Sequence, residues 1–90
     1  MEIRHLVISG RVQGVCYRAS MAREAQALGV TGWVRNRSDS SVEAMVSGST
    51  DQVAAMMSWC RRGPSAAVVE HVAVEPGSGE FFDFEQRLSV

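Results

Sequence analysis

The residues best suited to chemistry lie in one stretch, Ser-Gly-Arg-Val-Gln-Gly-Val-Cys-Tyr-Arg, at positions 9–18. Gly10 and Gly14 let the backbone curl inward where side chains would block it. An apolar run precedes the stretch and an Ala-rich helical pattern follows it, which predicts a strand, a short loop and a helix start. A helix N-terminus offers unpaired N–H groups and a positive dipole end, and Arg18 adds a cation there. The stretch therefore predicts an anion site best suited to phosphate.

The rest of the chain excludes several ways of handling phosphate. A Walker loop needs a lysine after its second glycine, and all nine basic residues of this chain are arginine. A cysteine phosphatase needs its cysteine six positions before the loop arginine, where this chain has Val12. Metal-dependent phosphatases need clustered Asp and His, whereas the aspartates are scattered at positions 39, 51 and 83. No Ser-His-Asp set can be recognised either.

What remains is Arg18, the loop N–H groups and the amide of Asn36. This set can bind a phosphoryl group and place a water molecule, but it offers no strong base or nucleophile. It suits a substrate whose leaving group needs no proton. An acyl phosphate is such a substrate, because it releases a carboxylate with a pKa of about 4. Positioning and charge stabilisation would then supply the catalysis.

The hydrophobic pattern predicts the elements that must position these groups. Strands are expected over residues 3–10, 30–36, 42–47, 67–75 and 81–88, and helices over 18–28 and from a capping box at Ser49 to about residue 62. In the fourth strand Val68, Val72 and Val74 are expected on one face. In the last strand Phe82 and Phe84 are expected to point inward.

The order β-α-β-β-α-β with a short terminal strand predicts the α+β, ferredoxin-like split βαβ arrangement. Right-handed crossovers place both helices on one face of an antiparallel sheet. Strand directions then bring the loop before Arg18 and the strand end at Asn36 to the same end of the molecule. The third strand fits between them, so the two residues start about two strand spacings, roughly 10 Å, apart.

Length and composition limit the class of protein. Ninety residues predict a single domain, residues 1–90. The net charge of −1 argues against nucleic-acid binding, since phosphate contacts need surplus basic charge. No apolar run approaches the roughly 20 residues of a membrane span, and the start lacks signal-peptide features. We therefore expect a cytoplasmic monomer, with no membrane partner, in which Cys16 and Cys60 are reduced thiols outside any metal site. A redox-linked pair of these cysteines remains a minor alternative.

The two stretches resemble the two signatures of the acylphosphatase family. Positions 10–18 resemble its phosphate loop, and Gly-Trp-Val-Arg-Asn at positions 32–36, with Val-Glu at 42–43 and Gly48, resembles the second signature. The resemblance implies a ferredoxin-like fold and hydrolysis of acyl phosphates to carboxylate and phosphate, without cofactor, metal or phosphoenzyme. It implies that Asn36 orients the attacking water. The phosphoryl group would be bound by Arg18 and by the backbone of Val12, Gln13, Gly14, Val15, Cys16 and Tyr17.

The chain departs from the family pattern at Ser40, where the family usually has glycine. If this turn requires a positive φ, serine there costs about 1 kcal/mol. Cys16 occupies a variable loop position near the helix N-terminus. Oxidation of its thiol could block the loop, but an inert loop residue is the favoured interpretation. Gln13 is expected to contribute its backbone N–H rather than its side chain. The physiological acyl phosphate is not encoded in any pocket motif, so broad specificity for the acyl part is predicted.

Other interpretations stay open at this stage. A non-catalytic ferredoxin-like module that only binds an anion is the main alternative; an intact Asn36 favours the enzyme. An RNA-binding sheet of this topology is disfavoured, because the first and third strands carry no aromatic residues. Arg11, Arg35 and Arg37 are expected to be surface charges that could steer a dianionic substrate. Tyr17 and Trp33 are expected to be packing residues that shape the loop and the sheet.

Overall fold

The computed structural model describes all residues from 1 to 90. The elements follow the order predicted, five strands and two helices. They are β1 (Glu2–Arg11), α1 (Tyr17–Leu28), β2 (Thr31–Asn36), β3 (Val42–Gly48), α2 (Thr50–Arg62), β4 (Val68–Pro76) and β5 (Phe84–Gln86). Neither helix is long and apolar enough to cross a membrane.

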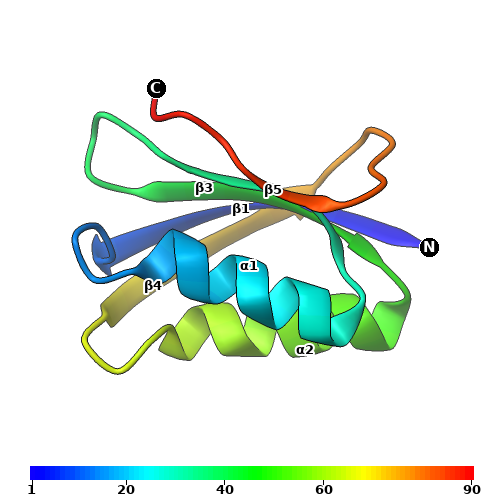
Figure 1. Cartoon of the computed structure of the whole chain (residues 1–90), viewed down its shortest axis with the longest axis horizontal. Helices are drawn as coiled ribbons and strands as arrows, with labels where there is room; N and C mark the ends of the chain where they lie inside the picture. Colours follow the sequence, from blue (N-terminus) through cyan, green and yellow to red (C-terminus); the bar gives the residue numbers. More distant parts are fainter.

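The strands form one sheet in the order β4-β1-β3-β2-β5, and both helices cover the same face of it (Figure 1). This is the ferredoxin-like α+β fold. As predicted, β3 lies between β1 and β2, and Val42 pairs with Ile8 on one side and with Asn36 on the other. The prediction of a wholly antiparallel sheet was wrong at one edge. There β5 pairs parallel to β2, with Val34 opposite Gln86, so the sheet is mixed.

The helix ends have the local chemistry expected from the sequence. Ser49 caps α2: its hydroxyl accepts from the Gln52 N–H at 3.1 Å, and the Gln52 side chain accepts from the Ser49 N–H at 2.8 Å. Gly29 ends α1 in the left-handed conformation.

Ser40 has a positive φ of 74°. The β2–β3 turn therefore does require the left-handed conformation, which costs serine conformational free energy.

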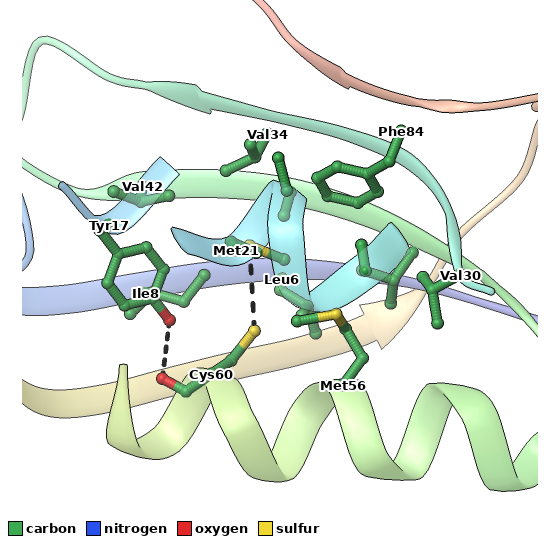
Figure 2. Packing of buried hydrophobic residues seen from close by; sticks show 14 of the residues in the cluster. Leu6, Ile8, Tyr17, Met21, Val30, Val34, Val42, Met56, Cys60 and Phe84 are labelled. Carbon is green, nitrogen blue, oxygen red and sulfur yellow. Dashed lines mark hydrogen bonds between the residues drawn. The ribbon is translucent and has the colours of Figure 1, made fainter. Parts of the chain in front are cut away.

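The core fills the space between the sheet and the two helices. Leu6 and Ile8 from β1, Met21 from α1 and Met56 and Cys60 from α2 are fully buried there (Figure 2). The buried residues of both helices therefore face the sheet. Burial of this kind is the main source of stability, and it fixes the two helices against the strands.

Two predicted strand faces were wrong. A bulge where Ser9 pairs with His71 and Gly10 pairs with Val69 shifts the alternation in β4, so Val69 packs against the core and Val68 is 57% exposed. The last strand is short. Phe84 is buried, but Phe82 lies before the strand begins and is exposed.

Trp33 packs on the face of the sheet opposite the core. The guanidinium groups of Arg35 and Arg87 each lie 4.8 Å from the centre of its ring. Stacked cations of this kind shield an aromatic side chain that no helix covers. The expectation that Trp33 is a packing residue is confirmed, and its contacts tie β2 to the segment that follows β5.

Three segments meet at one end of the molecule. Figure 1 shows the loop after β1, the β2–β3 turn and the C-terminus at the same end. Hydrogen bonds join them: the Gln13 side chain donates to the carbonyl oxygen of Arg37, and the Val90 N–H donates to that of Asn36 at 3.0 Å.

Candidate active site

The loop between β1 and α1 presents its backbone as an anion cradle. Gly14 has a φ of 73°, and Cys16, the N-cap of α1, has a φ of 63°. None of the backbone N–H groups between Val12 and Ala19 donates to a backbone carbonyl of the chain. The cap position also makes no side-chain hydrogen bond to the first turn. These N–H groups, with the positive end of the α1 dipole, are available to an anion.

The loop, the start of α1 and the end of β2 enclose an open cavity of about 320 Å³. Arg18 and Asn36 both line it, which brings together the two residues singled out from the sequence. The lining residues are Val12, Gln13, Gly14, Cys16, Tyr17, Arg18, Ala19, Asn36 and Gln86. Of the predicted loop residues only Val15 does not line the cavity; its side chain belongs to the core cluster.

Arg18 and Asn36 line the cavity from different elements, and the side chain of each remains free to bind a ligand. Arg18 lies in the first turn of α1, and no carboxylate lies within ion-pairing distance of its guanidinium. Asn36 is the last residue of β2, where β3 pairs with it on one side and its carbonyl accepts from the Val90 N–H on the other. Its backbone is thus fixed from both sides. An unpaired guanidinium and a free amide beside a row of N–H groups favour a bound phosphoryl group.

The side chain of Gln13 does more than predicted. Its amide nitrogen donates to the carbonyl oxygens of Arg37 and Ser41, each at 2.9 Å. The expected contribution of its backbone N–H to the anion site stays a prediction, and the side-chain contact adds a structural role to it. Sequence alone gives no signal for this contact, since Gln13 and Ser41 are 28 positions apart.

Two lining residues, Ala19 and Gln86, were missed. Ala19 follows Arg18 in the first turn of α1, where both residues are half-buried. Gln86 lies two residues after Phe84, so strand alternation places it on the helix-facing side of β5. The pattern could have given this orientation, but not the fact that β5 joins the sheet beside β2.

The two cysteines have different environments. Cys16 is exposed and lines the cavity, whereas Cys60 is fully buried with its sulfur 4.0 Å from that of Met21 (Figure 2). Burial raises the pKa of the Cys60 thiol to about 12. Cys60 is therefore a core residue, and the alternative of a redox-linked pair with Cys16 is not supported.

The basic residues near the site are mostly engaged elsewhere. The Nε of Arg35 donates to Glu43 at 2.7 Å, and an Arg37 nitrogen lies 3.8 Å from an Asp39 oxygen. Neither of these arginines lines the cavity, and Arg11 is an exposed residue at the end of β1. They are surface charges, as expected, and Arg18 is the basic residue within the cavity.

The donor set of the cavity defines the chemistry it can perform. It contains the Arg18 guanidinium, the amides of Asn36 and Gln86, the Cys16 thiol and backbone N–H groups, but no carboxylate or imidazole. The Gln13 amide and the Tyr17 hydroxyl also lie at the cavity, but they already donate to backbone carbonyls of the chain. Such a set can bind and polarise a phosphoryl group and can orient water. It cannot remove a proton from that water through a strong side-chain base.

Comparisons with known proteins show the family of the chain. The acylphosphatase family model matches residues 4–86. An acylphosphatase of Cupriavidus pinatubonensis is 55% identical over 87 residues, which cover 97% of each chain. The structure of an acylphosphatase from Coxiella burnetii matches with a TM-score of 0.90 at 37% identity, covering 96% of this chain and 92% of the other. The acylphosphatase from Bacillus subtilis matches with a TM-score of 0.92 at 26% identity, covering 97% and 99%. The chain belongs to the acylphosphatase family.

Proposed function

We propose that the cavity at the N-terminus of α1 is the active site of this acylphosphatase, with Arg18 and the loop N–H groups binding the phosphoryl group and Asn36 orienting the attacking water. One observation carries the proposal: an unpaired guanidinium and a free amide line the same cavity as a loop whose backbone N–H groups have no acceptor within the chain. The reaction is hydrolysis of an acyl phosphate to a carboxylate and inorganic phosphate.

The phosphoryl group is held by fixed dipoles and one mobile cation. Gly14 and Cys16 turn the loop backbone with positive φ values, and the loop N–H groups have no backbone acceptor within the chain. Arg18 supplies the formal positive charge and can form two parallel hydrogen bonds to phosphoryl oxygens. Charge on these oxygens is retained in the transition state, so donors already in place lower the barrier without rearrangement.

Water attacks the phosphorus while the carboxylate leaves. The side-chain amide oxygen of Asn36 accepts a hydrogen bond from the water and so directs a lone pair of the water oxygen toward phosphorus. A bond forms between the water oxygen and phosphorus, and the bond from phosphorus to the acyl oxygen breaks. The leaving carboxylate, with a conjugate-acid pKa of about 4, needs no proton. The water's proton passes to a phosphoryl oxygen of the substrate itself, which fits a cavity that lacks a carboxylate and an imidazole.

The acyl part of the substrate extends out of the cavity. The cavity is open to solvent, so the acyl group need not be enclosed by the chain. We therefore propose broad specificity for the acyl group.

The site is complete within one chain, which supports a monomer and a single domain over residues 1–90. The net charge of −1 disfavours a nucleic-acid partner, and the free thiols of Cys16 and Cys60 fit the reducing cytoplasm.

The test is hydrolysis of benzoyl phosphate in ¹⁸O-labelled water, with a chelator present. The proposal expects turnover, with one labelled oxygen in the released phosphate and none in benzoate. Label in benzoate would show attack at the carbonyl carbon and would contradict the proposal. Phosphate binding without turnover would instead support the non-catalytic anion module.

A further inference from the structure

The amide of Gln13 spans two parts of the site that the sheet does not join directly. The loop follows β1 and Asn36 ends β2, and β3 separates these two strands. No ladder hydrogen bond can therefore run from β1 to β2. The Gln13 side chain connects the loop to the end of β2 instead. Its amide nitrogen donates to the carbonyl oxygens of Arg37 and Ser41, each at 2.9 Å.

The two acceptors, the carbonyl oxygens of Arg37 and Ser41, lie at the two ends of the β2–β3 turn. The Arg37 N–H donates to the Ser41 carbonyl at 2.9 Å, and the Ser40 N–H donates to the Arg37 carbonyl at 3.2 Å. Each carbonyl therefore already accepts one bond within the turn, and the bond from Gln13 uses its second lone pair. Arg37 directly follows Asn36 in the chain. A displacement of this part of the turn would therefore move Asn36 with it.

We infer that Gln13 is a positioning residue that sets the distance between the phosphate loop and Asn36. The inference rests on the proposed roles of the loop and Asn36. Water and phosphoryl group must meet at near-attack distance, and a shift of about 1 Å can cost a hundredfold in rate. The distance between the loop and Asn36 therefore depends on the two hydrogen bonds that the Gln13 side chain donates. It touches neither water nor phosphorus through that side chain, and it acts through Asn36.

Removing the two donors should leave the fold intact. The Arg37 and Ser41 carbonyls keep their bonds within the turn, so no buried acceptor is left without a partner. Methionine has the length and flexibility of glutamine without its donors, and Gln13→Met adds no charge near the phosphate site. Gln26 lies exposed near the end of α1, about 12 Å along the helix from Arg18, so Gln26→Met is the matched control.

The experiment is a double-mutant cycle on benzoyl phosphate hydrolysis with Gln13→Met and Asn36→Ala. We expect Gln13→Met to lower kcat about tenfold while inhibition by inorganic phosphate changes less than about twofold, and Gln26→Met to behave as wild type. In the Asn36→Ala background, Gln13→Met should have almost no further effect, because Gln13 acts through that residue. Additive losses, a wild-type kcat for Gln13→Met, or a loss confined to phosphate affinity would overturn the inference.

A second measurement separates this inference from the proposed function. In the NMR spectrum, the side-chain amide of Asn36 should give one sharp pair of resonances with phosphate bound in wild type and in Gln26→Met. In Gln13→Met it should broaden or split, as the turn loses its fixed position. A fully active Asn36→Ala would contradict the proposed role of Asn36. An unchanged Asn36 resonance in Gln13→Met would contradict the positioning role of Gln13, whatever the activity of Asn36→Ala.

Discussion

The hydroxyl of Tyr17 donates a hydrogen bond to the backbone carbonyl oxygen of Cys60 at 2.7 Å (Figure 2). Tyr17 is the first residue of α1 and immediately precedes Arg18, whereas Cys60 lies in the last turn of α2. The carbonyls of a last helical turn lack partners within the helix, so the phenol satisfies one of them. The bond therefore fixes the start of the helix that carries Arg18 against α2.

Tyr17→Phe should lower the free energy of unfolding by about 1–2 kcal/mol, because it removes a buried hydrogen bond and leaves the Cys60 carbonyl without its side-chain donor. The ring and its packing against Trp59, with centroids 5.4 Å apart, remain. Activity per folded molecule should stay within about twofold of wild type. Urea unfolding measures the stability; a change below about 0.3 kcal/mol would show that this bond does not anchor the helix.

The two thiols should differ in reactivity. Cys16 is exposed at the cavity, while burial raises the pKa of Cys60 to about 12. A thiol-exchange reagent at pH 8 should modify one cysteine in the native protein and both in denaturant, since the thiolate is the reactive form. Inorganic phosphate should slow the modification of Cys16 because both occupy the same cavity. Native labelling of Cys60, or labelling of Cys16 that phosphate leaves unchanged, would contradict this description.

Glu43 should contribute a pH-dependent part of the stability. Burial tends to raise its pKa, but hydrogen bonds from His5, at 2.6 Å, and Arg35, at 2.7 Å, outweigh burial and lower the pKa below the ordinary 4.5. A carboxylate with a lowered pKa stabilises the fold above its unfolded pKa, and this stabilisation is lost as the pH falls through the folded pKa.

Glu43→Gln should therefore cost about 1 kcal/mol at pH 7. The difference from wild type should shrink as the pH falls below 4.5 and disappear once the carboxyl is protonated in both states. Unfolding by urea at pH 7, 5 and 3 measures it. A difference that does not depend on pH would show that Glu43 acts through packing rather than charge. Because Glu43 does not line the cavity, kcat should not change at pH 7.

Gly32 and Gly14 should respond differently to alanine. At Gly32, with a φ of 137°, a Cβ would lie 1.8 Å from the Met45 carbonyl oxygen, a backbone clash that β2 and β3 cannot relieve without separating. Gly32→Ala should cost about 3 kcal/mol or more. At Gly14 a Cβ would meet nothing within 4 Å, so Gly14→Ala should cost only the strain of a positive φ, about 1 kcal/mol. Equal urea midpoints for the two variants would contradict the tight pairing at Gly32.

The sequence was sufficient for features that depend on local pattern. Hydrophobic spacing and capping residues predicted both helices, and the right-handed crossover rule placed β3 between the strands that end at the site. Arg18 and Asn36 were found because they sit at the ends of predictable elements. The family resemblance at positions 10–18 and 32–36 added their roles.

Features that depend on long-range register could not be predicted. Three residues, Phe84 to Gln86, do not reveal which sheet edge they join or in which direction, so the parallel pairing of β5 and the lining role of Gln86 were missed. The bulge opposite Ser9 depends on pairing between β1 and β4, and it reversed the face of Val68. The contact from Gln13 to the β2–β3 turn also requires the folded chain.

The central claim is that Arg18 and the loop bind the phosphoryl group while Asn36 places the water. The most direct measurement is kcat for benzoyl phosphate together with the Kd for inorganic phosphate in wild type, Arg18→Ala and Asn36→Ala. We predict that Asn36→Ala loses at least a hundredfold in kcat and keeps its phosphate Kd within about threefold, whereas Arg18→Ala loses both turnover and phosphate binding. A fully active Asn36→Ala, or an Arg18→Ala that binds phosphate like wild type, would contradict this division of roles.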